Sequence, residues 1–222
     1  MSCFPKTREL MDLSHTLAAP LLENHEYPWE ILDAIGEFIL SLGPTLDKDS
    51  FCNPKVGVWI AKSANIAPTA HIGAPCIIGE NTEVRHCAFI RGNALVGDMA
   101  VIGNSAELKN CIIFDGAQIP HFNYVGDSVI GYRAHLGAGA VTSNVKSDKS
   151  PVAVKCGGET LMTGRKKLGA MVGDFAEIGC GAVLNPGTVI GRHASVYPQV
   201  SVRGVVPQDH IVKSDTLSVR RR

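Results

Sequence analysis

Two basic residues are spaced in a way that could bind an anion. The numbers of Arg91 and Lys109 differ by 18, and each residue directly follows an aliphatic one, Ile90 or Leu108. A guanidinium group binds a phosphate through paired hydrogen bonds, and an ammonium group adds a point charge. A phosphate site is one interpretation, and surface ion pairs of little energetic weight are the other. The candidate carboxylates for such pairs are Glu107, Asp98 and Glu83.

A histidine further along the chain could accept a proton. His121 lies in the run 119–127, and histidine is the side chain type that ordinarily exchanges a proton near neutral pH, which suits it to take a proton from an amine. An isolated histidine is nevertheless more often a surface or core residue than a catalytic one. Composition and spacing therefore make His121 a candidate base without assigning that role.

The segments that position these residues follow a repeat of six. An aliphatic residue recurs at every sixth position in one phase, and glycine often follows it. These positions are Ile60, Ile66, Ile72, Ile78, Val84, Ile90, Val96, Ile102 and Leu108. The phase slips by one at Ile113 and again at Ile130, and the repeat returns from Val172 to Val202.

A period of six fits neither an amphipathic helix nor a plain alternating strand, and it predicts an all-β solenoid with inward aliphatic residues and small residues at the corners. The repeat resembles the hexapeptide repeat of left-handed parallel β-helices, in which three hexads form one triangular coil. This resemblance supplies the handedness. Coils stack about 4.8 Å apart, so residues separated by three hexads become neighbours, and Arg91 and Lys109 are expected on one face.

The chain divides into three parts. Residues 1–50 lack the repeat, and the spacing from Ile31 to Leu42 predicts a helical N-terminal segment, interpreted as a cap over the open first coil, with a partner-binding arm as the alternative. Residues 51–209 form the β-helix, with an excursion at about 143–170 that has the pattern of a hairpin. Residues 210–222 are expected to form a basic tail.

Charge and cysteine content exclude several classes of protein. Lys plus Arg and Asp plus Glu both number 21, so neither nucleic acid nor a membrane surface is an expected partner. Seven cysteines without a C-x-x-C pair argue against a disulfide framework or a zinc ribbon. No leader and no membrane-spanning stretch is recognisable, and the expected location is the cytoplasm.

Several motifs together carry a more specific resemblance. Arg91, the triplet 107–109, the run from His121 to Asp127, and the run from Leu136 to Thr142 with Asn144 resemble the acetyltransferase domain of bifunctional glucosamine-1-phosphate acetyltransferase/N-acetylglucosamine-1-phosphate uridylyltransferase. The segment 163–170 is similar to the C-terminal domains of archaeal-type sugar-1-phosphate nucleotidylyltransferases with acetyltransferase activity. The resemblance spans roughly residues 60–207.

This resemblance implies an N-acetyltransferase that uses acetyl-CoA to acetylate an amino-sugar 1-phosphate, as a homotrimer with sites between neighbouring subunits and no metal. In the family pattern His121 is the catalytic base. The residues implied to bind the sugar phosphate are Arg91, Lys109, Tyr124, His135, Asn144 and Lys167. The residues implied to face coenzyme A are Ala138 and Cys180.

The sequence departs from the family pattern in three places. His135 stands where the bacterial pattern has Asn, Cys180 replaces a small residue, and residues 1–55 cannot hold a nucleotide-binding domain. A second hypothesis is therefore a non-catalytic partner or regulator of a separate nucleotidylyltransferase. A zinc carbonic anhydrase on the same type of helix is disfavoured, because no third histidine matches His121 and His135 at coil spacing.

Overall fold

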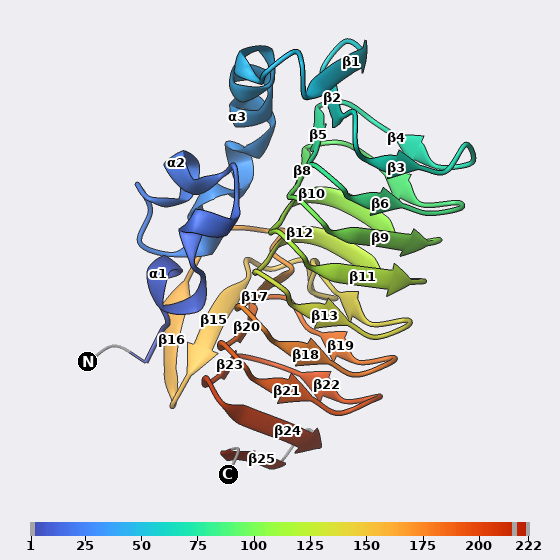
Figure 1. Cartoon of the computed structure of the whole chain (residues 1–222). Coiled ribbons are helices and arrows are strands. Elements are labelled where there is room, and N and C mark those ends of the chain that lie inside the picture. The colour runs from blue at the N-terminus through green and yellow to red at the C-terminus, as the bar shows by residue number, and fades with distance from the viewer. Residues whose placement is uncertain (1–2, 215–216, 221–222) are drawn as a thin grey trace.

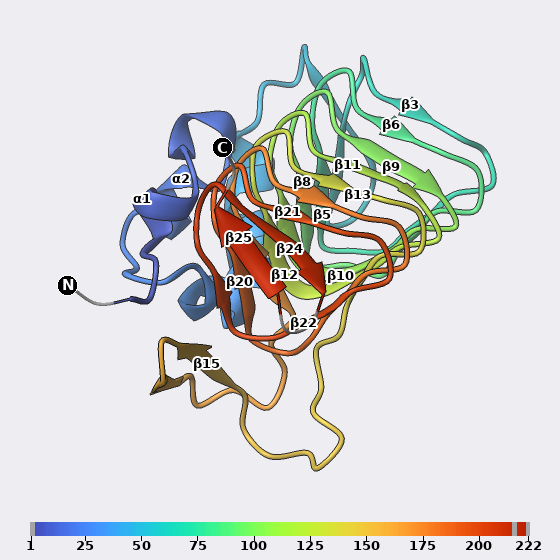
Figure 2. The same ribbon diagram turned by 90° about the horizontal axis from the view of Figure 1, so that it is seen from below.

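Hexad aliphatic residues build a three-sided β-solenoid. A computed structural model describes residues 3–214 and 217–220 (Figure 1). Parallel strands stack into three flat faces, and in Figure 2 the chain winds clockwise as it approaches the reader, which is a left-handed turn. The predicted left-handed β-helix is confirmed.

The first face is one sheet, which ends in an antiparallel hairpin. Its strands are β3 (Asn65–Ile66), β6 (Glu83–Val84), β9 (Val101–Asn104), β11 (Gln118–His121), β13 (His135–Leu136), β18 (Glu177–Ile178), β21 (Ser195–Val196), β24 (His210–Ser214) and β25 (Leu217–Arg220). Strand β24 pairs in parallel with β21, so the solenoid continues beyond residue 209, where the tail was expected to begin. Residues 215–216 and 221–222 of that tail lie outside the described residues.

The second and third faces share two long strands, β10 (Glu107–Ile113) and β12 (Tyr124–Ile130), which run around the corner between them. The other strands of the second face are β4 (His71–Ile72), β7 (Phe89–Ile90), β14 (Val141–Thr142), β19 (Val183–Leu184) and β22 (Ser201–Val202). Those of the third face are β2 (Val58–Ala61), β5 (Cys76–Ile78), β8 (Ala94–Val96), β17 (Ala170–Val172), β20 (Thr188–Ile190) and β23 (Val205–Val206), and β1 (Phe51–Lys55) pairs antiparallel with β2.

The register explains the slips in the repeat. Ile78 pairs with Val96, which lies three hexads further on in the sequence. Val96 pairs with Ile113, and Ile113 with Ile130, and each of these steps is one position shorter than three hexads. The missing position falls at the corner that β10 and β12 pass through. Ile130 next pairs with Val172, a much longer step, because the excursion is inserted into this coil.

The excursion leaves the solenoid between β14 and β17. It contains an antiparallel hairpin of β15 (Ala153–Cys156) and β16 (Glu159–Met162), visible at the lower left of Figure 2.

The N-terminal segment is helical, as predicted, but it does not sit over the first coil. Its elements are the α-helices α1 (Thr7–Leu10), α2 (Ala19–Leu22) and α3 (Ile35–Leu42), and the 3₁₀ turns η1 (Leu13–His15), η2 (Pro28–Asp33) and η3 (Gly43–Thr45). They lie along the outside of the third face (Figure 1). The expected position was wrong because the third face carries outward aliphatic residues that need cover: Ile77, Leu95, Ile112, Val129, Met171 and Val189. The inward residues of the first coil, such as Ile60, are only partly buried.

A buried carboxylate joins the helical segment to the coils. Asp174 accepts hydrogen bonds from the backbone N–H groups of Asp12 at 2.7 Å and Tyr132 at 2.8 Å, and Arg192 pairs with it at 3.3 Å. Burial raises the pKa of Asp174, and the three donors offset part of that cost.

Truncation of an outward residue should test this packing. Leu95 is fully buried on the outer side of β8, so Leu95→Ala should lower the free energy of unfolding by about 2–5 kcal/mol through lost contacts and a cavity. Thermal unfolding measures the effect, with Met99→Ala, at a 57% exposed side chain, as the control. Equal midpoints for the two variants would contradict helices packed over this face.

Candidate functional site

Arg91 and Lys109 lie on adjacent coils, where the second face meets the third. The backbone N–H of Arg91 donates to the carbonyl of Leu108 at 2.9 Å, and this places Arg91 beside Lys109 in the ladder. Arg91 Nη1 donates to Glu107 Oε1 at 2.9 Å, and Lys109 Nζ lies 3.2 Å from Asp127 Oδ2. The spacing thus placed the cations correctly, and each has a carboxylate partner.

Asp127 connects the polar groups of this corner. Its side chain is only 6% exposed, and its carboxylate accepts hydrogen bonds from Lys109 Nζ, Asn110 Nδ2 and Asn144 Nδ2. A buried carboxylate is costly without such donors. Asp127 therefore fixes the positions of Lys109 and Asn144 relative to each other.

Tyr124 and Asn144 extend the network across the second face. Asn144 Nδ2 donates to the Tyr124 hydroxyl at 3.2 Å. Burial raises the pKa of Tyr124, and the nearby carboxylates of Asp127 and Glu107 add to this effect, so the phenol is neutral near pH 7. A Cβ at Gly126 would lie 2.5 Å from the Tyr124 oxygen and 2.9 Å from Asn144 Nδ2, so this close approach requires glycine.

The returning end of the excursion lies against the same corner. The N–H of Leu168 donates to the carbonyl of Asn144 at 3.0 Å, and the N–H of Gly169 donates to the carbonyl of Asp127 at 2.8 Å. Lys167, directly before Leu168, is exposed. We define the polar corner as Arg91, Glu107, Lys109, Asn110, Tyr124, Asp127 and Asn144, and Lys167 lies next to it along the chain.

His121, Ala138 and Cys180 form a column at the other end of the second face, where the first face turns into it. Gly139 N–H donates to the His121 carbonyl at 2.9 Å, and Gly181 N–H donates to the Ala138 carbonyl at 2.8 Å. The backbone N–H of His121 donates to Asn123 Oδ1 at 3.0 Å. The imidazole of His121 is exposed, and no residue within 3–214 or 217–220 forms a hydrogen bond or an ion pair with it.

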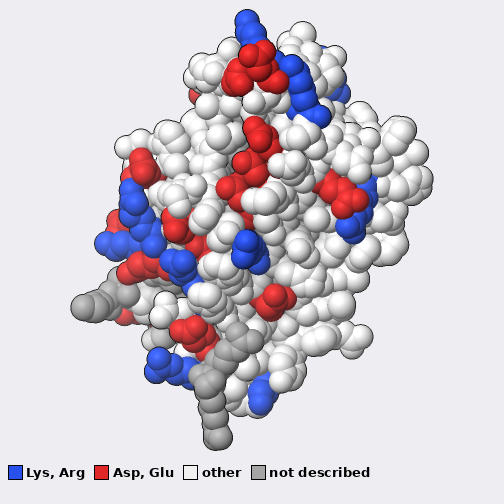
Figure 3. Space-filling view, viewed as in Figure 1, with Lys and Arg blue, Asp and Glu red and all other residues white. Residues whose placement is uncertain are grey.

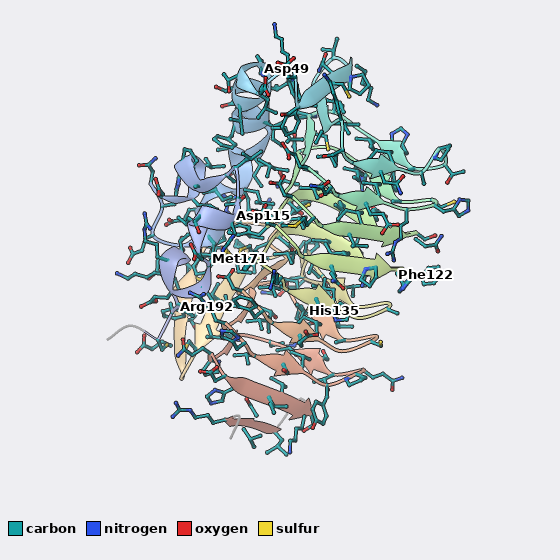
Figure 4. All side chains as sticks on the ribbon, in the orientation of Figure 1. Asp49, Asp115, Phe122, His135, Met171 and Arg192 are labelled. Atoms are coloured by element: carbon teal, nitrogen blue, oxygen red, sulfur yellow. The ribbon has the colours of Figure 1, made fainter. Side chains whose placement is uncertain are left out.

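His135 lies apart from the polar corner. It begins β13 on the first face, and its Nδ1 lies 3.0 Å from Glu177 Oε2. Figure 4 places it near the middle of that face, whereas Phe122, the neighbour of His121, lies at the outer edge of the coils. With Arg133 and Gln118 among other residues, His135 lines a hollow of about 390 Å³. One chain therefore does not bring His135 together with Arg91 and Lys109.

The main residue that sequence reasoning missed is Asp127, which was noted only as part of a motif. The available signal was its corner position beside Asn110, one coil away. Both have positive φ, of 49°, in a conformation that Asn and Asp adopt more readily than most residues. Glu107 was considered only as a possible surface ion-pair partner and as a member of the triplet 107–109.

The described residues contain neither a cluster of metal ligands nor a membrane-spanning helix. Among the described residues, no three His, Cys, Asp or Glu side chains are grouped to hold a metal ion. No helix in that part of the chain is long and apolar enough to cross a membrane. Figure 3 shows Lys and Arg interspersed with Asp and Glu on the visible side, without a field of one sign.

Comparison with known proteins identifies relatives of the solenoid. Residues 74–157 match the family model described as the GMPPB C-terminal domain. A bifunctional sugar-1-phosphate nucleotidylyltransferase/acetyltransferase from Sulfurisphaera tokodaii is 40% identical over 87 residues, which cover 39% of this chain and 22% of that protein. The bifunctional protein GlmU of Methanococcus maripaludis is 30% identical over 199 residues, which cover 88% of this chain and 48% of that protein. The chain is related to the C-terminal regions of these proteins.

The matched segments span between about a fifth and a half of these relatives' own length. Among solved structures, PerB from Caulobacter crescentus in complex with CoA and GDP-perosamine is 20% identical with a TM-score of 0.36, over 69% of this chain and 52% of that one.

Proposed function

We propose that the protein transfers an acetyl group from acetyl-CoA to the amine of an amino-sugar 1-phosphate. The observation that carries this proposal is the polar corner, where two cations on adjacent coils share one side with a neutral phenol and an amide. The relative from Sulfurisphaera tokodaii, a bifunctional sugar-1-phosphate nucleotidylyltransferase/acetyltransferase, supports the same substrate class.

Arg91 and Lys109 are proposed to bind the phosphate. The Arg91 side chain is 45% exposed and that of Lys109 is 26% exposed, so an anion can reach both. A phosphate would compete with Glu107 for Arg91, whose fork matches phosphate oxygens. Lys109 would keep its ion pair with Asp127 and would donate a further hydrogen bond to the phosphate. Tyr124, Asn144 and Lys167 would hold the sugar.

His121 is proposed to act as the general base. The amine nitrogen attacks the thioester carbon and becomes positively charged, and the His121 imidazole accepts its proton. The tetrahedral intermediate then collapses with cleavage of the C–S bond, and the coenzyme A thiolate leaves and takes up a proton. Ala138 and Cys180, below His121 in the column, would face coenzyme A.

We propose a homotrimer, and the placement of these groups on different faces supports a site between subunits. His121 and the polar corner lie at the two ends of the second face, and His135 lies on the first. A site that also includes His135 must combine the first face of one subunit with the second face of another. The seven unpaired cysteines fit a reducing compartment, and we propose the cytoplasm.

Removal of either cation should test the phosphate site. Arg91→Ala or Lys109→Ala should weaken binding of the phosphorylated amino sugar by about tenfold or more, because a hydrogen bond to a charged group is lost. Titration calorimetry measures this, and acetyl-CoA binding should stay nearly unchanged. Arg85→Ala is the matched control, because Arg85 pairs with Glu83 on the first face. If the unmodified protein acetylates the unphosphorylated sugar equally well, the phosphate site is refuted.

The second candidate is a non-catalytic partner of a separate nucleotidylyltransferase. It is favoured by the ion pairs of Arg91 with Glu107 and of Lys109 with Asp127, which leave little uncompensated charge at the polar corner. Coenzyme A binding discriminates the two, since a scaffold has no reason to bind it.

A further inference from the structure

Two cysteines far apart in sequence face each other at the edge of the molecule. Cys3 precedes α1, and Cys156 ends β15 in the excursion. The thiol of Cys3 donates to the carbonyl of Cys156 at 3.2 Å, and the thiol of Cys156 donates to the carbonyl of Cys3 at 3.0 Å. This reciprocal arrangement holds both sulfurs between the same two backbone segments.

Small reagents can reach this pair. Both residues are partly exposed, and both line a hollow of about 410 Å³ that also includes Glu9, Arg192 and Gln208. The hollow lies between the N-terminal segment, the excursion and the last coils.

The pair bridges two segments that also meet elsewhere. Arg165, on the returning half of the excursion, donates to Asp33 Oδ1 at 2.8 Å and to the Glu30 carbonyl at 3.0 Å. The excursion then rejoins the coils through the bonds of Leu168 and Gly169 at the polar corner. A covalent link at Cys156 would therefore restrain a segment whose two ends border that corner.

We propose that Cys3 and Cys156 form an intramolecular disulfide when the protein meets a low-molecular-weight disulfide such as oxidised glutathione, tethering the excursion to the N-terminal segment. The bond does not depend on the proposed acetyl transfer.

The chemistry proceeds by two thiol–disulfide exchanges. One protein thiol loses its proton and attacks oxidised glutathione, which gives a mixed disulfide and releases one glutathione thiol. The second protein thiol then loses its proton and attacks the protein sulfur of the mixed disulfide, which expels the second glutathione thiol. In sum, two protein thiols are oxidised to a disulfide, and oxidised glutathione is reduced to two thiols.

The rate should rise with pH. Burial, together with the neighbouring thiol of Cys3, raises the pKa of Cys156 to about 12. Because the thiolate is the reacting form, the thiolate fraction of Cys156 increases about tenfold for each pH unit in the range 7 to 9.

The remaining cysteines provide internal comparisons. Cys76 and Cys111 are fully buried and both pair with Ala94 on opposite sides, so they lie two strand spacings apart, about 9.6 Å, too far for a disulfide. Cys52, Cys87 and Cys180 are exposed and should stop at mixed disulfides with glutathione.

The test is oxidation of the full chain with oxidised glutathione at pH 7, 8 and 9, followed by alkylation, digestion and mass spectrometry without reduction. We expect one crosslinked peptide pair, Cys3 with Cys156, which forms faster at higher pH and is lost with dithiothreitol. The midpoint of thermal unfolding should rise by about 5 °C or more, because the bond closes a long loop.

Two variants make the result specific. Cys3→Ser should abolish the crosslink and the thermal shift, whereas Cys87→Ser, at an exposed cysteine outside the pair, should keep both. Recovery of Cys3 and Cys156 only as separate alkylated or glutathionylated peptides at pH 9 would overturn the proposal. So would a crosslink from either residue to another cysteine.

Discussion

Replacement of Ile102 by Asp should prevent folding. Ile102 points into the solenoid, is fully buried, and pairs with Val84 and Ile119 on the two neighbouring coils. The change removes about 1.5–3 kcal/mol of apolar burial and places a carboxylate among aliphatic residues that offer no donor, at a further cost of several kcal/mol. Together these losses rival the whole stability of a typical domain, about 5–15 kcal/mol.

Circular dichroism and size-exclusion chromatography measure this effect. Asn81→Asp is the matched control, because Asn81 is exposed at a corner with a φ of 54°, which Asp also tolerates. The control should fold normally. An Ile102→Asp protein with the parent's unfolding midpoint would contradict the inward packing of the hexads.

Replacement of His121 by Ala should lower the rate of acetyl transfer by about 10²- to 10⁴-fold, the usual contribution of a positioned base. Substrate affinity and thermal stability should change little, because the imidazole is exposed and no described residue hydrogen-bonds to it. Steady-state kinetics would show the loss in kcat rather than in KM.

His86 supplies the control for this experiment. It is exposed in the same corner column, two coils before His121, and its imidazole contacts Thr69. His86→Ala should retain the parental rate. Full activity in His121→Ala would place the base elsewhere, with Tyr124 or His135 as the next candidates.

The inner surface of the solenoid was predictable because one inward aliphatic residue per hexad is a strong periodic signal. The packing of the helical segment was not predicted, although its signal was present. Ile77, Leu95 and Ile112 each directly precede an inward aliphatic residue of the third face. Only every third hexad carries this outward apolar residue. The signal is therefore lost when all hexads are compared with one common pattern.

The site shows the same contrast between local and long-range information. The neighbourhood of Arg91 and Lys109 follows from a spacing of one coil. The role of Asp127 depends on Asn144, whose position is fixed partly by the returning excursion. No local sequence pattern predicts where an insertion longer than a whole coil rejoins the solenoid.

The face on which His135 lies could also be predicted from the sequence, by assigning each hexad to a face. It directly precedes the inward residue Leu136 of the first face, whereas Arg91 directly follows the inward residue Ile90 of the second. Assignment of each hexad to one of three faces separates these residues in a single chain without any coordinates. Their use in one site then requires a second subunit.

The most direct test of acetyl transfer is incubation of the purified protein with acetyl-CoA and a panel of amino sugars, with and without a 1-phosphate, with free coenzyme A and acetylated sugar quantified by mass spectrometry. We predict stoichiometric release of coenzyme A and acetylation of an amino-sugar 1-phosphate, with much slower turnover of the sugar that lacks the phosphate. If the protein neither binds coenzyme A nor acetylates any amino-sugar phosphate, this result would contradict the proposed acetyltransferase activity. It would favour the role of a non-catalytic partner of a separate nucleotidylyltransferase.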